Sequence, residues 1–472
     1  MWRCGLPERV MVVAGWCVAL WGMLQFVGWL PSGSEYFVVT GPFDNPAGIG
    51  MSLSMLLPYA LSQVQSEDGW KKMVGYGGVA CMGMAILLSE SRTGMMAACV
   101  AGTVMYASRI GRRQVFRLLG LGVLAAAILY LYKPVSANGR LFMAWIGLRL
   151  AVRHLWWGAG WEGFDLGYMT EQAAFFASHP DSAWAWVADN VKSPFNEYLL
   201  FFIRFGLSGC LMAVLAGSCW ARWAKRRYVA AKRPALASLG AGAVCACFSY
   251  PSSYVILVCL GVVALAVLSL PVSLADGWPV GRWRTLLASV MLLAGVGGHV
   301  VCRCGYEHRR QALEARSAGG EQSEALDMAY QELYRMPYFA THAVFLYNYA
   351  LHLYEGAKYE AASDVLGQYE KHCRDYDGRM LRAYIWMNLD KPRRAVEAFE
   401  SASRMLPSRL QPRYEQVRLY EELGERSQAV RCAEEALACP VKVQSLKTNY
   451  LRDELGDYLR AVRQDGAQSL LD

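Results

Sequence analysis

Hydrophobic and polar positions are distributed differently in the two parts of the chain. Residues 10–302 hold long nonpolar runs, whereas residues 303–472 mix Arg, Glu, Tyr and Ala. A run of roughly 17–25 nonpolar residues is long enough to cross a bilayer as a helix. Nine such runs can be drawn, at 10–30, 47–64, 72–89, 93–110, 115–132, 196–220, 235–252, 254–271 and 285–302. The pattern predicts an all-α fold, with a polytopic membrane bundle of about nine transmembrane helices followed by a soluble domain.

The composition supports a membrane protein and excludes several other classes. The chain of 472 residues is 55% hydrophobic and 18% charged, whereas charged residues make up about a quarter of an ordinary globular chain. A disordered chain, a collagen-like chain, a disulfide scaffold and a single soluble domain are therefore excluded. The first nonpolar run follows Arg3 and Arg9 without a small-residue cleavage site, so we expect a retained helix rather than a signal peptide.

The distribution of Lys and Arg predicts the orientation in the membrane. With the N-terminus inside, the inner loops carry clusters of basic residues, whereas the short outer connections 31–46 and 251–253 carry none. The net charge of +8 is then explained without a nucleic-acid partner. In this orientation the turn at 89–93, the long loop 133–195 and the C-terminal domain lie on the outer face.

The predicted outer loop keeps basic residues on the side where they are usually avoided. They are Lys133, Arg140, Arg149, Arg153 and Lys192. Residues 140–156 can form an amphipathic helix at the bilayer surface, with arginines that extend toward the headgroups. Alternatively, they form a cationic pocket for an anionic lipid headgroup. Both interpretations predict a membrane lipid as a partner.

The polar part of the chain has a 34-residue period. Ala361, Ala395 and Ala429 are each 34 residues apart. In the middle unit, small residues are followed by Pro407, as in tetratricopeptide (TPR) repeats. The expected domains are a membrane domain, a linker with a capping helix and a TPR domain, at 1–302, 303–340 and 341–472. Such solenoids bind peptides or proteins in a concave groove, so we expect a protein partner there.

The sequence contains no P-loop, no GxGxxG after a strand, no HExxH and no GxSxG. Its seven histidines do not cluster, so neither a metal ion nor another cofactor is expected. Candidate chemistry instead lies in five short motifs on the predicted outer face. They are 41–46 (Gly-Pro-Phe-Asp-Asn-Pro), 89–94 (Ser-Glu-Ser-Arg-Thr-Gly), Gly139-Arg140 with Trp145, Gly158-x-Gly160, and Asn196-Glu197 with Gly206 and Gly209.

These five motifs, in this order, resemble those of the O-antigen ligase and polymerase family of membrane glycosyltransferases, over about 40–270. The resemblance implies transfer of a glycan from undecaprenyl diphosphate to an acceptor hydroxyl, on lipid A-core or on a protein. Neither a nucleotide sugar nor a metal would be required. It also implies a multi-pass protein of the bacterial inner membrane that serves lipopolysaccharide biosynthesis or protein O-glycosylation, with a periplasmic C-terminal domain.

The family's chemistry implies roles for individual residues of this chain. Arg92 and Arg140 would clamp the diphosphate, because guanidinium groups stay charged and donate in pairs to phosphate oxygens. For Arg92, the alternative is a charge at a helix end with Glu90 as its partner. Further candidate substrate-binding residues are Asn45, Arg149, Arg153 and Asn196.

The sequence departs from the family at Phe195, where members commonly carry a histidine thought to activate the acceptor hydroxyl. A general base is still expected to help an alcohol nucleophile. Glu197 is the favoured candidate, although a carboxylate at a helix start also suits the helix dipole. Asp189, His179 and Asp181 are alternatives in the same loop. Alternatively, the substrate itself supplies the base, or catalysis is slow. The chain also has fewer predicted spans than is usual in the family.

Two alternatives to ligation stay open. A polysaccharide polymerase would use the same donor and the same site to join glycan repeats. A non-catalytic membrane scaffold would recruit envelope proteins through its TPR domain, and Phe195 is the best argument for it. The attached repeat domain favours a protein acceptor or a protein partner.

Overall fold

The computed structural model describes residues 6–34, 36–107, 111, 113, 114, 117, 134–226, 228, 232–269, 302, 304–439, 441, 442 and 444–468. Every regular element in these ranges is a helix, which confirms the all-α class. The chain divides into two compact units. The first comprises Met1–Lys133, Phe195–Phe201 and Cys210–Leu292, and the second comprises Pro134–Pro194, Phe202–Gly209 and Leu293–Asp472.

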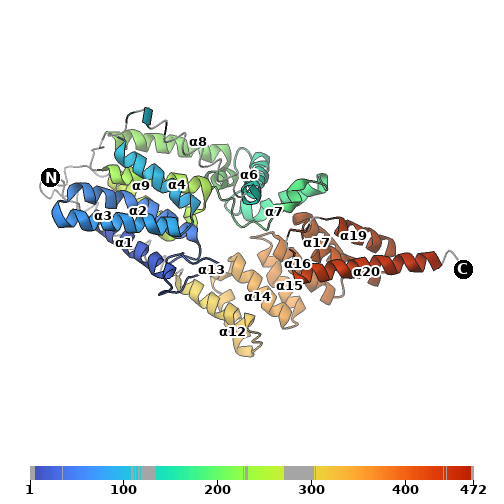
Figure 1. Cartoon of the computed structure of the whole chain (residues 1–472). Helices are drawn as coiled ribbons and strands as arrows, with labels where there is room; N and C mark the ends of the chain where they lie inside the picture. Colours follow the sequence, from blue (N-terminus) through green and yellow to red (C-terminus); the bar gives the residue numbers. More distant parts are fainter. Residues whose placement is uncertain are drawn as a thin grey trace. The chain divides into compact units, whose positions relative to one another are not determined.

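The first unit is a bundle of apolar helices (Figure 1). They are α1 (Leu6–Phe26), α2 (Pro46–Ser66), α3 (Gly69–Leu88), α4 (Arg92–Tyr106), α8 (Glu197–Lys225), α9 (Arg233–Phe248) and α10 (Val255–Ser269), with the short helix η3 (Pro251–Ser253) before α10. They coincide with seven of the nine predicted spans, and the runs 115–132 and 285–302, apart from the single residues 117 and 302, lie outside the described residues. Among the described helices, α1, α2, α3 and α8 are long and apolar enough to cross a bilayer. The chain is therefore a membrane protein.

Helix α2 is central in this bundle, because it packs against α1, α3, α4 and α9. Its side chains Ile49, Met51 and Leu53 are fully buried. The contact with α4 depends on glycine, since a Cβ atom added at Gly94 would lie 2.7 Å from the backbone of Gly50. Small residues at such crossings let membrane helices approach closely. The turn before α4 is thereby held beside the first turns of α2.

The second unit contains a helical solenoid (Figure 1). Its three successive helix pairs are α14 (Ala343–Glu355) with α15 (Tyr359–Tyr369), α16 (Tyr376–Asn388) with α17 (Pro392–Met405), and α18 (Gln411–Glu422) with α19 (Arg426–Ala438). They are preceded by α12 (Glu324–Tyr334) and α13 (Pro337–Ala340), and followed by α20 (Leu446–Gln468). Helix α12 buries Leu326 and Tyr330 against the first pair, and α20 buries Leu451 and Leu455 against the last pair. Both ends of the apolar core are therefore covered.

The predicted register of the repeats is confirmed in the second and third pairs and is wrong by one residue in the first. Ala395 and Ala429 are fully buried, but Ala361 is exposed and Ala362 is buried in its place. The turn shows the same offset, because Ala357 has a positive φ of 57° one residue after the aligned glycine. The first spacing is thus one residue shorter than the strict period applied to the sequence.

The long loop of the second unit packs along the solenoid. It contains α6 (Pro134–Arg153), α7 (Gly163–Ser178) and the short helix η1 (Ala183–Trp186), and α7 contacts α17. The polar contacts join Glu162 to His372 (2.9 Å), Gln172 to the carbonyl of Met405 (2.8 Å), Lys192 to Asp375, and Asp189 to Lys442 (2.9 Å). The solenoid partners lie at or after the ends of α15, α17 and α19. The loop therefore follows the edge formed by the connections between helix pairs.

Candidate functional site

The first motif forms the turn that starts α2. Asn45 caps the helix, with its Oδ1 accepting a hydrogen bond from the backbone N–H of Ala47 at 2.8 Å. Its Nδ2 donates to the hydroxyl of Tyr250 at 3.4 Å. The preceding turn is held by Gln25 of α1, whose Oε1 accepts from the backbone N–H of Gly41 at 2.7 Å. Asn45, a predicted substrate-binding residue, thus has a structural role and also joins two segments that are far apart in sequence.

The second motif places Arg92 at the first position of α4. Ser91 caps this helix by accepting from the N–H of Gly94 at 3.2 Å. A cation at a helix N-terminus is unfavourable to the helix dipole, so both the arginine and the helix end favour an anion. Arg92 is half-buried, and in the described part of the chain Glu90 forms no ion pair with it. The suggested pairing with Glu90 is therefore not observed among these residues.

The last motif starts α8 and contacts the connection between α9 and α10. Asn196 caps α8, with its Oδ1 accepting from the N–H of Leu199 at 2.9 Å. Glu197 accepts hydrogen bonds from both the hydroxyl and the backbone N–H of Ser252, the latter at 3.1 Å. Phe195 has a positive φ of 51°, which directs its ring onto Tyr250 at 5.2 Å between centroids.

Aromatic side chains connect the first and last motifs in the first unit. Tyr250 and Tyr254 stack at 5.9 Å, and Tyr254 meets Phe43 edge-on at 5.4 Å. With Phe195, these residues form what we call the aromatic cluster. The hydroxyl of Tyr254 donates to Oδ1 of Asp44 at 3.1 Å. The segments 41–46, 195–197 and 250–254 thereby meet in one place. This place offers the carboxylates of Asp44 and Glu197, the hydroxyl groups of Tyr250, Ser252 and Tyr254, and the ring faces of the cluster.

Two glycine motifs meet in the second unit. The N–H groups of Ala159 and Gly160 donate to the carbonyls of Ile203 and Arg204 at 2.7 and 3.1 Å. This backbone pairing occurs where α8 is interrupted at Gly206, which has a φ of 62°. Side chains are excluded there, because a Cβ atom added at Gly158 would lie 2.3 Å from the carbonyl oxygen of Arg204. The two motifs therefore form one structural element.

The arginines of α6 have different environments. Arg149 and Arg153 both pair with the buried Glu171, at 2.9 and 3.0 Å. These pairs hold α6 against α7, and their predicted contact with substrate stays a prediction. Arg140 lies near the start of α6 and is exposed. Since Arg92 belongs to the first unit and Arg140 to the second, their joint clamp on a diphosphate also stays a prediction.

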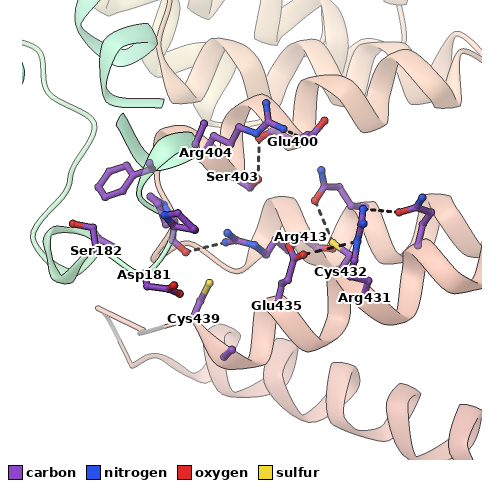
Figure 2. Close-up of a pocket in the computed structure, with 18 of the residues that line it drawn as sticks. Asp181, Ser182, Glu400, Ser403, Arg404, Arg413, Arg431, Cys432, Glu435 and Cys439 are labelled. Atoms are coloured by element: carbon purple, nitrogen blue, oxygen red, sulfur yellow. Dashed lines mark hydrogen bonds and ion pairs between the residues drawn. The ribbon is translucent and has the colours of Figure 1, made fainter. Parts of the chain in front are cut away.

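The other candidate bases lie in the second unit, on the segment that borders the solenoid. Burial acts to raise the pKa of Asp189, but the hydrogen bond and charge of Lys442 outweigh it and lower that pKa. His179 bonds to Ser178 at 2.9 Å. Figure 2 shows Asp181 at the edge of a cavity of about 760 Å³ that α17, α18 and α19 line on the other side. Of these groups, Asp189 joins the loop to the solenoid through its ion pair with Lys442.

The fold defines a class of protein, a helical membrane protein that also carries a domain of helical repeats. Residues 77–214 match the family model described as O-antigen ligase, and this match indicates an enzyme of the ligase or glycosyltransferase type. The matched range contains Arg92, Arg140, both glycine motifs and Glu197, so the resemblance drawn from the motifs is confirmed.

One solved structure and the curated proteins complete the comparison. The crystal structure of yeast Tom70 is 10% identical to this chain, with 89% of each chain covered and a TM-score of 0.28. No curated protein has significant sequence similarity to this chain.

Sequence reasoning missed the connection 250–254, which supplies Tyr250, Ser252 and Tyr254 to the cluster, and it gave Asp44 no role. A signal was present, because Tyr-Pro-Ser-Ser-Tyr is a polar and aromatic turn between two apolar runs. This turn carries no charge and matches none of the five motifs, so the sequence pattern alone does not mark it as part of the site.

Proposed function

We propose that this protein transfers a glycan from undecaprenyl diphosphate to an acceptor hydroxyl at the outer face of the bacterial inner membrane. The observation that carries the proposal is the convergence of motifs in the first unit. The aromatic cluster joins 41–46 to 195–197, and the close contact of α2 with α4 holds the turn of Arg92 beside the same helix start. Three of the five motifs, which lie far apart in the sequence, meet in this unit, and chance alone would not be expected to bring them together.

The leaving group in this reaction is a lipid-linked diphosphate, which needs cations more than it needs an acid. Arg92 stands at a helix N-terminus, where its charge and the helix dipole both attract an anion. We propose that Arg92 and Arg140 donate to the phosphate oxygens and stabilise the negative charge that develops as the glycosyl bond breaks. Asn45 and Asn196 hold the turns in place through their caps.

The acceptor is either lipid A-core or a protein, and the solenoid favours a protein. Tyr347, Met380 and Tyr384 line a groove of about 360 Å³ on the helices of the solenoid. Tyrosine and methionine suit the recognition of polypeptides. A photo-crosslinker at position 380 should capture one envelope protein. Its capture of lipopolysaccharide alone would favour the lipid acceptor, and products with lengthened glycan would favour the polymerase.

The central test is substitution of the two arginines. Arg92→Ala and Arg140→Ala should each abolish the surface glycoconjugate, whereas Lys71→Ala, an exposed cation at the start of α3, should leave it unchanged. Arg92→Lys should recover only part of the activity, because lysine cannot donate in a bidentate manner. Unchanged glycosylation in both alanine variants, with normal membrane insertion, would contradict the proposal and favour a scaffold.

Orientation is tested separately. Single cysteines at positions 92 and 140, in a background without the native cysteines, should react with a membrane-impermeant maleimide added from the periplasmic side. Labelling of both positions only after the inner membrane is opened would contradict the proposed location.

A further inference from the structure

The inference concerns the group that takes the proton from the acceptor, and it rests on the proposed function. An alcohol becomes a better nucleophile when a base accepts its proton as the new bond forms. Phe195 cannot do this. Among the described residues, the carboxylate of Asp44 accepts a hydrogen bond from Tyr254 of the aromatic cluster, and that of Glu197 accepts from Ser252 in the connection that carries Tyr250 and Tyr254.

Of these two carboxylates, Glu197 is already committed to the protein. Its Oε1 accepts two hydrogen bonds from Ser252, and Glu197 is also the first residue of α8, where a carboxylate stabilises the helix. These contacts tie the start of α8 to the connection 250–254. Glu197 therefore has a sufficient structural role.

Asp44 is placed differently. It is exposed, it forms no ion pair among the described residues, and the hydroxyl of Tyr254 is its hydrogen-bond donor at 3.1 Å. That bond uses Oδ1 and orients the carboxylate, while Oδ2 makes no hydrogen bond to any described residue. The hydroxyl of Tyr254 faces Asp44, and the ring of Tyr254 stacks on that of Tyr250.

The ring faces beside Asp44 suit an acceptor. Phe43, Tyr254, Tyr250 and Phe195 are all half-buried and form a continuous series of ring contacts at 5.4, 5.9 and 5.2 Å. Half-buried aromatic rings offer a rigid apolar surface against which the nonpolar face of a sugar ring or an apolar side chain can pack. Phe195 is one of these rings, which gives the family's histidine position a different use in this chain.

We propose that the aromatic cluster is the acceptor subsite and that Asp44, oriented by Tyr254, is the general base for the acceptor hydroxyl. The acceptor O–H bond breaks and its proton passes to the carboxylate of Asp44. The acceptor oxygen bonds to the anomeric carbon, and the electron pair of the anomeric C–O bond leaves with undecaprenyl diphosphate. Asp44 then releases the proton to water.

The test uses full-length protein in liposomes, mixed with membranes of a strain that lacks the gene. Under the proposed function these membranes hold both the lipid-linked glycan and the unmodified acceptor. Asp44→Asn keeps the hydrogen bond from Tyr254 but cannot take a proton, so its rate should fall by about 100-fold or more. The acid limb of its pH–rate profile should disappear. The membrane concentration that gives half-maximal rate should stay the same as for wild type.

Matched variants separate the base from its surroundings. Asp44→Glu should recover part of the rate, and Phe195→Ala should raise the acceptor concentration needed for half-maximal rate. Glu197→Gln should keep the acid limb of the pH–rate profile, whatever rate it retains. A wild-type rate in Asp44→Asn would overturn the inference but leave the proposed function standing. An acid limb that is lost in Glu197→Gln and kept in Asp44→Asn would have the same consequence. Absence of transfer by the wild-type protein would instead overturn the proposed function.

Discussion

At the scale of single residues, two strained positions mark the site. Glu90 and Phe195 have φ values of 53° and 51°, and each directly precedes the residue that caps a helix. Non-glycine residues in this region carry roughly 1–3 kcal/mol of strain, and they concentrate at functional sites. At the second turn the side chain has a use that glycine could not supply, because the ring of Phe195 packs against Tyr250.

The crossing of α2 and α4 gives a prediction for one residue. In Gly94→Ala the added methyl group would lie 2.7 Å from the backbone of Gly50, so the two helices must separate. We expect a loss of stability of about 1–3 kcal/mol. Gly102→Ala, on the same helix with no neighbour within 4 Å of the added atom, should change stability by less than about 1 kcal/mol. Thermal unfolding in detergent compares the two variants, and equal melting temperatures would contradict the close contact.

A second prediction concerns the charges beneath the loop. Burial acts to raise the pKa of Asp375, but the charge and hydrogen bond of Lys192 outweigh it and lower that pKa. Burial raises the pKa of its neighbour Asp377, and the charge of Asp375 adds to the effect. Asp375→Asn should therefore destabilise the packing of the loop at neutral pH by roughly 1 kcal/mol. The expected loss is this small because Lys192 is largely exposed and solvent screens its charge. Asp377→Asn should be neutral or stabilising.

The pH dependence follows from the signs of these shifts. A carboxyl whose pKa is lower in the folded protein contributes stability above its unfolded pKa, about 4, and loses it as the pH falls through the folded value. Wild-type loop protection, measured by hydrogen exchange over 163–194, should weaken below about pH 4. The weakening should be smaller in Asp375→Asn. A steeper loss in that variant would show that another carboxyl dominates.

At the scale of elements, the interruption of α8 depends on a single glycine, Gly206. Gly206 combines a φ of 62° with a backbone contact that leaves no room for a side chain. Gly206→Ala should destabilise the protein by at least about 2 kcal/mol and separate 158–160 from α8. Gly217 lies on the same helix, and a Cβ atom added there would have no neighbour within 4 Å, so Gly217→Ala serves as the control. Limited proteolysis near 158–160 should increase only in the first variant, and equal cleavage in both would argue against the pairing.

The sequence predicted elements better than contacts between them. Apolar runs predicted the described membrane helices because length and hydropathy suffice for that purpose. The meeting of Asn45 with Tyr250, or of Gly158 with Gly206, depends on how helices pack, and no local pattern encodes it. The pairing of Arg149 and Arg153 with Glu171 escaped prediction for the same reason, since a glutamate 18 or more residues away gives no local signal.

At the scale of the whole molecule, the solenoid has an internal partner. The loop that carries Arg140 buries Gln172 completely against α17. It is joined to the connection after α15 by a hydrogen bond between Glu162 and His372, and to the connection after α19 by an ion pair between Asp189 and Lys442. A solenoid of this kind is usually regarded as a binding surface for other proteins. Here one edge is used by the chain itself, and the groove lined by Tyr347 and Tyr384 remains for an external ligand.

This arrangement predicts the effect of removing the repeats. A protein that ends after residue 302 should insert its bundle but lose the order of 134–194, because the surface that covers Gln172 is gone. Protease should then cleave that loop rapidly, and glycan transfer should fall to background. A truncated protein with a protected loop and normal transfer would contradict the internal role of the solenoid.

The row of contacts along the solenoid edge also limits how this protein can evolve. Most repeat proteins tolerate the gain or loss of a unit, because each unit touches only its neighbours. In this chain a single continuous segment is fastened at three consecutive junctions, at His372, Met405 and Lys442. An inserted or deleted unit would shift every later junction relative to that segment. Homologues that share this fastening should therefore hold their repeat number constant even where the repeat sequences diverge.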